Sequence, residues 1–225
     1  NIIMHPTKLH FIQKEILRTL TMQKWARFRD MRPKRVDSNL YNYHLRLLQK
    51  NGLVEKVENK GYRLSPEGLR YVDYVSLEQF EPRQQPKLIT KLVLVDETGR
   101  ILMWPKYKQP FIGTWSLPSG KVHFDDESVA AAAQREIAYI TDTPTALTHV
   151  GLMEVEAKIN DVVITHILEH IFYGKINARD VKHELAHWQA VSDVDSLECS
   201  PGTCEAVTFG ISGHPFRYEH VAVDW

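Results

Sequence analysis

The chain contains 225 residues, of which 43% are hydrophobic and 25% charged, as is typical of a soluble globular protein of one or two domains. No apolar run approaches the roughly 20 residues needed to cross a bilayer, and the first residues lack the pattern of a secretory signal. Only two cysteines occur, Cys199 and Cys204. We therefore expect a cytoplasmic protein with no membrane contact, and two ordinary thiols rather than a disulfide or a zinc site.

The charge is distributed unevenly along the chain, although the formal net charge is zero. Residues 1–80 hold 15 Lys and Arg against 8 Asp and Glu, whereas residues 81–225 hold 13 against 20. Residues 81–87, EPRQQPK, contain two prolines and no apolar side chain, as is typical of a linker. We therefore predict a basic domain over residues 1–80 that faces a polyanion, a linker over 81–87, and a second domain over 88–225.

The first half of the chain has the pattern of three helices, a β-hairpin and a closing helix. The helices are predicted over residues 6–23, 24–31, 38–51 and 69–80, and the hairpin over 53–65. Apolar side chains spaced by three and four give the first helix one buried face, made of Leu9, Ile12, Ile16, Leu17 and Leu20. In the third helix the same spacing predicts an inward stripe of Leu40, His44, Leu47 and Leu48. His44 is then a packed, hydrogen-bonded core residue rather than a ligand.

Residues 38–72 resemble the recognition helix, wing and closing helix of bacterial winged-helix repressors. This resemblance implies a DNA-binding domain that reads double-stranded DNA. Polar and basic side chains on the outer face of the third helix, in the turn before it and at the hairpin tip are suited to base edges and phosphates. The predicted DNA contacts are Lys34, Arg35, Ser38, Asn39, Tyr41, Asn42, Arg46, Lys60, Tyr62 and Arg63. The alternative is a protein-docking module whose polar side chains are merely solvated.

The second half mixes strands and helices, with strands predicted at residues 88–96 and 101–104 and a helix at 126–140. Residues 113–137 resemble the Nudix box, and members of this family hydrolyse nucleoside diphosphates linked to another moiety, using Mg²⁺ or Mn²⁺. Gly120, Glu127, Arg135 and Glu136 match the motif, with one extra residue between the glycine and the first glutamate. Glu127 and Arg135 are expected to brace the loop.

Two carboxylates of the family motif are missing. The resemblance places metal-binding glutamates at positions 139 and 140, one helix face with Glu136, but Tyr139 and Ile140 stand there. Only Glu136 is left as a weak metal candidate, and Glu127 and Glu136 are the only candidate catalytic residues. Since the metal supplies several kcal/mol, its loss would slow hydrolysis roughly a thousandfold or more.

Other acidic side chains and His123 offer a repositioned metal site as the alternative. They are Asp125, Asp126, Glu154, Glu156, Asp161 and Glu169. Asp125 and Asp126 are also suited to helix capping, which we regard as the simpler interpretation.

A pocket can persist without hydrolysis. Trp104, Lys106 and Lys108, together with Arg135 and Glu136, are the predicted ligand-binding residues, because cationic and aromatic groups suit a nucleotide such as ADP-ribose. His183, Glu184 and His187 match the zinc-peptidase signature, but they fall in a predicted loop that enters a strand, so we do not expect zinc there.

The predicted fold is α+β: an N-terminal winged helix-turn-helix followed by a Nudix α/β/α sandwich. The predicted function is a DNA-binding transcriptional regulator, a homodimer whose impaired Nudix-like domain senses a nucleotide-type metabolite or only dimerises. Related Nudix-type regulators have the reverse domain order. An active Nudix hydrolase with a repositioned metal site, and an interaction scaffold that binds neither DNA nor nucleotide, are the alternatives.

Overall fold

A computed structural model of the chain describes residues 9–76, 78–82, 84–213 and 215–225. The chain divides between Gln84 and Gln85 into two units, which are described here separately. The boundary lies within the segment expected to be a linker, although the first strand of the second unit already begins at Lys87. None of the described helices is both long enough and apolar enough to cross a bilayer.

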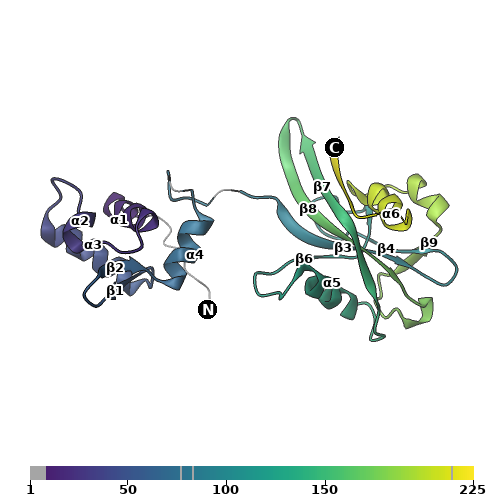
Figure 1. The fold of residues 1–225 in the computed structure, drawn as a ribbon. Helices are drawn as coiled ribbons and strands as arrows, with labels where there is room; N and C mark the ends of the chain where they lie inside the picture. The colour runs from purple at the N-terminus through teal and green to yellow at the C-terminus, as the bar shows by residue number, and fades with distance from the viewer. Residues whose placement is uncertain (1–8, 77, 83, 214) are drawn as a thin grey trace. The chain divides into compact units, whose positions relative to one another are not determined.

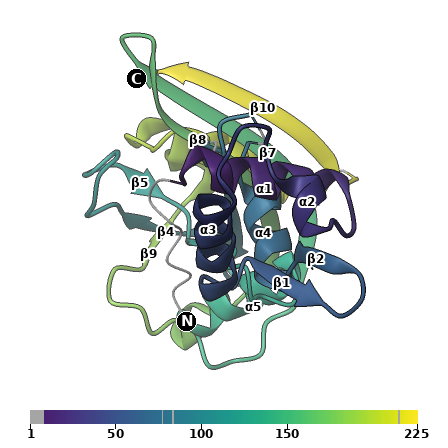
Figure 2. The ribbon, with the colours of Figure 1, turned by 90° about the vertical axis from the view of Figure 1, so that its left-hand side faces the viewer.

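The first unit has the element order of a winged helix. The order is α1 (Phe11–Met22), α2 (Phe28–Met31), α3 (Ser38–Lys50), β1 (Val54–Val57), β2 (Gly61–Leu64) and α4 (Pro66–Tyr74). β1 and β2 form an antiparallel hairpin, whose loop points away from the helices in both views (Figures 1 and 2). The predicted fold of the N-terminal half is therefore confirmed.

The core of the first unit follows the helical periodicity of α1. The five residues of its predicted inward face, from Leu9 to Leu20, are all buried. The helix begins at Phe11 because the His10 side chain and Gln13 form a capping box. Residues 6–8 of the predicted helix lie outside the described residues.

The closing helix α4 begins and ends earlier than expected. Ser65 accepts a hydrogen bond from the Gly68 amide at 2.9 Å, and Pro66 occupies the first turn, where its missing N–H costs nothing. A side chain at Gly68 would meet the Leu53 carbonyl oxygen, so the helix packs directly on the backbone that precedes the wing. The helix ends at Tyr74 rather than at Phe80.

The second unit is built on a mixed sheet with the strand order β10-β7-β8-β3-β4-β5. The strands on this path are β3 (Lys87–Val95), β4 (Ile101–Pro105), β5 (Trp115–Ser116), β7 (Leu147–Ile159), β8 (Val162–Lys175) and β10 (Arg217–Asp224). β6 (Ser119–Lys121) pairs with β3, and β9 (His187–Gln189) pairs with β4. β3 and β8 are parallel, as are β7 and β10, and the other pairs are antiparallel.

Helices cover the two faces of this sheet (Figure 1). α5 (Val129–Ala138) packs on one face with Leu92 and Leu94, and α6 (Thr203–Ile211) packs on the other with Val93. Two short 3₁₀ helices, Ala178–Asp180 and Val191–Ser196, lie in the connections. Because side chains of a strand alternate between faces, β3 contributes to both cores. The sandwich predicted for the C-terminal half is confirmed.

Candidate functional site

The outer face of α3 presents polar and basic side chains to solvent. Asp37 caps the helix, since its carboxylate accepts from the Asn39 and Leu40 amides at 2.8 and 3.1 Å. Ser38, Asn39 and Arg46 are exposed and Asn42 is half-buried. These four predicted DNA contacts are therefore available on one side of the helix, where successive turns bring them into line.

Tyr41 is wrongly predicted as a DNA contact, because its side chain is fully buried. Its ring packs edge-on against Phe28 at 4.8 Å between centroids, and burial raises the pKa of the phenol. The inward stripe is shifted by one residue from the expected one, so that Tyr41, His44, Leu45 and Leu48 face the core while Leu40 is 46% exposed. Tyr43, which is exposed, takes the outward position instead.

The remaining predicted DNA contacts lie in the turn before α3 and on the hairpin. Lys34 and Arg35 are exposed. The Lys60 ammonium lies 4.5 Å from the centre of the Trp25 ring, a cation–π contact. Tyr62 is half-buried against the core and pairs through its backbone with Ala26, so its side chain is less available than expected.

Arg63, the last predicted DNA contact, is exposed, and its Nε lies 2.5 Å from Glu55 across the hairpin.

His44 is packed in the core of the first unit. Its ring is stacked on His10, with 4.1 Å between centroids, and burial lowers the pKa of His44. His44 is a packed core residue as expected, although its Nδ1 has no hydrogen-bond partner among the described residues.

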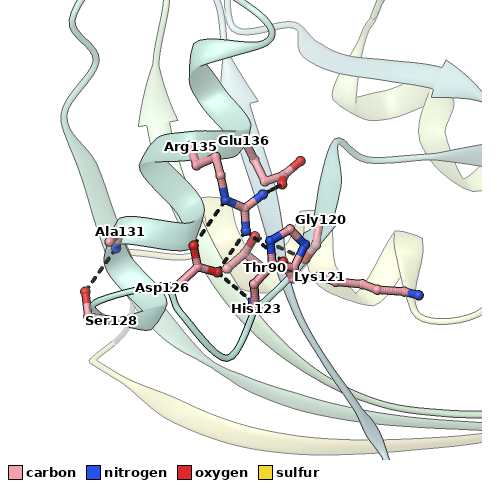
Figure 3. Close-up of polar contacts among 9 residues, drawn as sticks. All are labelled: Thr90, Gly120, Lys121, His123, Asp126, Ser128, Ala131, Arg135 and Glu136. Carbon is pink, nitrogen blue, oxygen red and sulfur yellow. Dashed lines mark hydrogen bonds and ion pairs between the residues drawn. The ribbon is translucent and has the colours of Figure 1, made fainter. Parts of the chain in front are cut away.

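In the second unit, Arg135 of α5 holds the loop between β6 and the helix (Figure 3). Its guanidinium lies 2.9 Å from Asp126 Oδ2 and donates to the Lys121 carbonyl oxygen at 2.9 Å. The same carboxylate accepts from the His123 amide at 2.6 Å. The pKa of Asp126 falls to about 2, chiefly because of its hydrogen bonds with Arg135 and His123.

The expected partner of Arg135, Glu127, is wrong. Glu127 is exposed, and the brace is made by Asp126, the residue at the regular motif spacing from Gly120. Counting from Gly120 rather than from Arg135 would have identified it. Nor does Asp126 cap α5, because Ser128 does so through its bond with the Ala131 amide.

Glu136 is packed against Gly120 (Figure 3). A Cβ atom at position 120 would lie 1.9 Å from the Glu136 carboxyl carbon, so glycine leaves room for the carboxylate in this orientation. Glu136 also forms an ion pair with Arg135. Arg135 therefore pairs with both Glu136 and Asp126, which leaves one negative charge in excess.

The side chains at this place do not fit a Mg²⁺ or Mn²⁺ cluster. α5 ends at Ala138, Tyr139 is 69% exposed, and Ile140 is buried in the core beside Ile137. Hard divalent ions need several oxygen ligands, but in the described part of the chain no group of three or more His, Cys, Asp or Glu is placed to hold a metal ion. The alternative acids, from Asp125 to Glu169, therefore form no such group among the described residues.

The predicted ligand-binding residues do not come together. Trp104 packs on the α5 side, with its ring 4.6 Å from that of His183, and Lys108 is exposed. Of the predicted ligand-binding residues, only Lys106 lines a cavity of about 90 Å³, which lies on the side of β3 opposite Arg135 and Glu136. The other charged residues that line this cavity are Lys87, Lys91 and Glu169, and no local sequence motif connects them.

The zinc-peptidase match and the two cysteines have ordinary structures. His183 lies in a loop and His187 in β9, so the pair is not on a helix, as expected. Cys199 and Cys204 are free thiols. Burial raises the pKa of Cys199 to about 12, which makes it a poor nucleophile.

Comparisons with known proteins agree with the motif. The family model described as "NUDIX domain" matches residues 86–200. No curated protein matches the chain. Among solved structures, the Nudix domain of Shewanella oneidensis NrtR complexed with ADP ribose is 14% identical, with a TM-score of 0.49, covering 63% of this chain and 94% of that one.

Two further structures are similar. Shewanella oneidensis NrtR complexed with a 27mer DNA is 16% identical with a TM-score of 0.47, and the match covers 55% of this chain and 59% of that one. A MutT Nudix hydrolase from Burkholderia pseudomallei is 25% identical with a TM-score of 0.45, covering 57% of this chain and 99% of that one. Because the family model spans half of the sequence, the chain belongs to the Nudix family.

Proposed function

We propose that the protein is a DNA-binding transcriptional regulator, in which the winged helix reads an operator and the Nudix domain senses a nucleotide-type metabolite such as ADP-ribose. The observation that carries the proposal is the exposed polar face of α3. Asn42 and Arg46 lie on it, and amide and guanidinium groups can each form two hydrogen bonds with a base edge. The net charge of residues 1–80 favours a polyanion.

The outward face of α3 includes one residue that the sequence pattern placed elsewhere. With Tyr41 buried, Tyr43 is the exposed aromatic side chain on this helix. Together with Ser38, Asn39, Asn42 and Arg46 it forms a stripe that can lie in a major groove. The Lys60 ammonium, held over Trp25, is suited to a phosphate beside the groove.

The proposal assigns no hydrolytic step to the Nudix domain. Glu136 is paired with Arg135, and position 140 belongs to the core. We propose that the chain acts as a homodimer, because two identical recognition helices would match a pair of half-sites about one helical turn apart.

Selection of bound fragments from genomic DNA by the full chain tests this function. We expect enrichment of one sequence, with Asn42→Ala or Arg46→Ala relaxing the preference by about 1–3 kcal/mol at one base pair. Arg70→Ala, a basic residue of α4, is the charge-matched control and should keep the preference. Equal affinity for selected and random DNA would contradict the proposed role as a sequence-specific regulator.

Salt dependence separates phosphate contacts from base contacts. Affinity should fall with salt with a log–log slope of about −0.9 per phosphate contacted. Lys60→Ala should weaken all sequences alike and reduce that slope by about 1. A variant that changes sequence preference without changing the slope would place Lys60 on a base instead.

A hydrolysis screen with Mn²⁺ and nucleoside diphosphate substrates, including ADP-ribose, tests the alternative enzyme. We expect no turnover above that of a Glu136→Gln variant. Turnover at ordinary enzymatic rates that Glu136→Gln abolishes would establish a hydrolase, and the winged helix would then be an accessory domain.

A further inference from the structure

The cavity on the α6 side of the sheet carries more cationic than anionic side chains. Lys87 and Lys91 come from β3, Lys106 from the segment after β4, and Glu169 from β8. If all four are ionised, the cavity has two positive charges in excess. Lys87 is exposed, Lys106 is half-buried and Lys91 is 3% exposed, so the three lysines that line the cavity differ in their access to solvent.

The floor of the cavity is a buried ion pair. The Lys91 ammonium lies 2.7 Å from Glu169 Oε2, and the two side chains are 3% and 2% exposed. Glu169 therefore supplies one negative charge against the three lysines that line the cavity. Burial lowers the pKa of Lys106, and the neighbouring Lys91 and Lys87 lower it further. An anion bound between these ammonium groups would relieve that repulsion.

The hydroxyl group of Thr165, which also lines the cavity, lacks a hydrogen-bond partner among the described residues. Thr165 is 4% exposed. A buried hydroxyl without a partner costs free energy. A ligand oxygen in the cavity would supply the acceptor that Thr165 lacks.

The size of the cavity limits what can enter. A volume of about 90 Å³ holds several water-sized groups, since one water needs about 10–15 Å³. Pockets that enclose a whole drug-sized ligand measure about 300–1,000 Å³. Only one small end of a ligand can therefore be enclosed.

We propose that this cavity binds the phosphate group of a phosphorylated small molecule without a metal ion, with Lys87 and Lys106 as cationic contacts and Thr165 as a hydrogen-bond donor. The proposal deepens the sensing role above and rests on it, because it names the part of the metabolite that is read. Ammonium groups bind phosphate through charge-assisted hydrogen bonds, which are stronger than neutral ones.

Calorimetric titration of the full chain in EDTA, with ribose 5-phosphate, ribose and adenosine as probes, tests the proposal. We expect ribose 5-phosphate to bind and the two neutral probes not to bind. Lys106→Met should weaken binding about tenfold to a hundredfold, as removal of a charged hydrogen-bond partner does. Lys175→Met, at the exposed last residue of β8, is the matched control and should bind within about twofold of the parent.

Adenosine binding as tightly as ribose 5-phosphate, unchanged binding by Lys106→Met, or binding that requires Mg²⁺ would each overturn the proposal. Should Lys106→Met fail to fold, Lys87→Met at the exposed opening provides the same comparison. The amide signal of Thr165 in NMR spectra should shift with ribose 5-phosphate, and no shift there would place the anion elsewhere. If the chain binds DNA sequence-selectively but does not bind ribose 5-phosphate, the phosphate site would be overturned and the proposed DNA-binding function would stand.

Discussion

The two faces of the Nudix sheet carry an excess of charge of opposite sign. On the α5 face, the carboxylates of Asp126 and Glu136 share the one guanidinium of Arg135, so a single negative charge is in excess. On the α6 face, three lysines meet one carboxylate. Strand β3 serves both, since Thr90 donates to the Gly120 carbonyl oxygen on one side while Lys91 reaches Glu169 on the other.

This difference indicates on which face a charged ligand would gain free energy from uncompensated charges of the protein. The family motif ordinarily gathers carboxylates on the helix to hold a cation, but here the two carboxylates near the helix share one arginine. The larger excess of charge is positive and lies on the opposite face. Charged groups that lack full compensation in a cavity are candidates for ligand binding.

The largest expected effect comes from breaking the buried pair. Glu169→Leu leaves the Lys91 ammonium buried and uncompensated, and should lower the free energy of unfolding by about 3–5 kcal/mol. The Lys91→Met/Glu169→Leu double variant should recover most of that loss, because neither charge is then buried. Denaturant unfolding followed by hydrogen exchange in β3 and β8 measures both. A double variant no more stable than the single one would show that packing rather than charge is responsible.

Adding a methyl group to each face should sharpen the comparison. A Cβ at Gly210 of α6 would lie 2.7 Å from Val93 Cβ in the core, so Gly210→Ala should cost about 1–3 kcal/mol. At Gly120 the obstacle is the mobile end of Glu136, which can rotate away, so Gly120→Ala should cost less than about 1 kcal/mol. Thermal unfolding of the two variants gives the order, and equal losses would contradict it.

Removing the brace on the α5 face should have a local effect. Arg135→Ala should speed hydrogen exchange at the His123 amide, which donates to Asp126, while leaving exchange in β3 unchanged. Because the pKa of Asp126 is lowered to about 2, its bonds stabilise the loop above pH 4 and are lost as the pH falls toward 2. Protection of His123 that disappears already near pH 4 would contradict this pairing.

The smallest expected effect concerns two histidines on the α5-side surface of β7 and β8. His149 Nε2 lies 3.1 Å from His170 Nδ1, and burial lowers the pKa of both rings. The folded state therefore favours the neutral rings, so stability is present above pH 6.5 and is lost as the pH falls below it. His170→Phe should reduce the decrease in melting temperature between pH 7 and pH 5, whereas an unchanged decrease would assign it to other groups.

The sequence predicts the buried face of an element correctly where its apolar residues fit only one face. The buried face of α1 and the two faces of β3 follow directly from spacings of three to four and of two. In α3 two stripes are apolar, one through Leu40 and Leu47 and one through Tyr41 and Leu48. The contact of Tyr41 with Phe28, which comes from another helix, decides between them, and no local pattern contains it.

The cavity could not be predicted for the same reason. Lys91 and Glu169 meet because β3 and β8 are parallel neighbours, with Ile89 opposite Glu169 and Lys91 opposite Ile171. The register of a parallel pair is set by the whole sheet, and each lysine alone looks like a solvated charge. The error at Glu127 has a different cause, because the sequence contains two conflicting spacings, one from Gly120 to Asp126 and one from Glu127 to Arg135.

The end of α5 determines how difficult it would be to restore the two missing carboxylates of the family motif. Ile140 is 1% exposed and its carbonyl oxygen accepts from the Lys182 amide at 2.9 Å, so this position anchors a distant segment. Writing glutamates back at Tyr139 and Ile140 would bury one of the two new carboxylates in hydrocarbon before any ion could arrive. A designer would first have to extend the helix and rebuild the hydrophobic layer beneath it, so restoring this carboxylate pair requires repacking of the core as well as two substitutions.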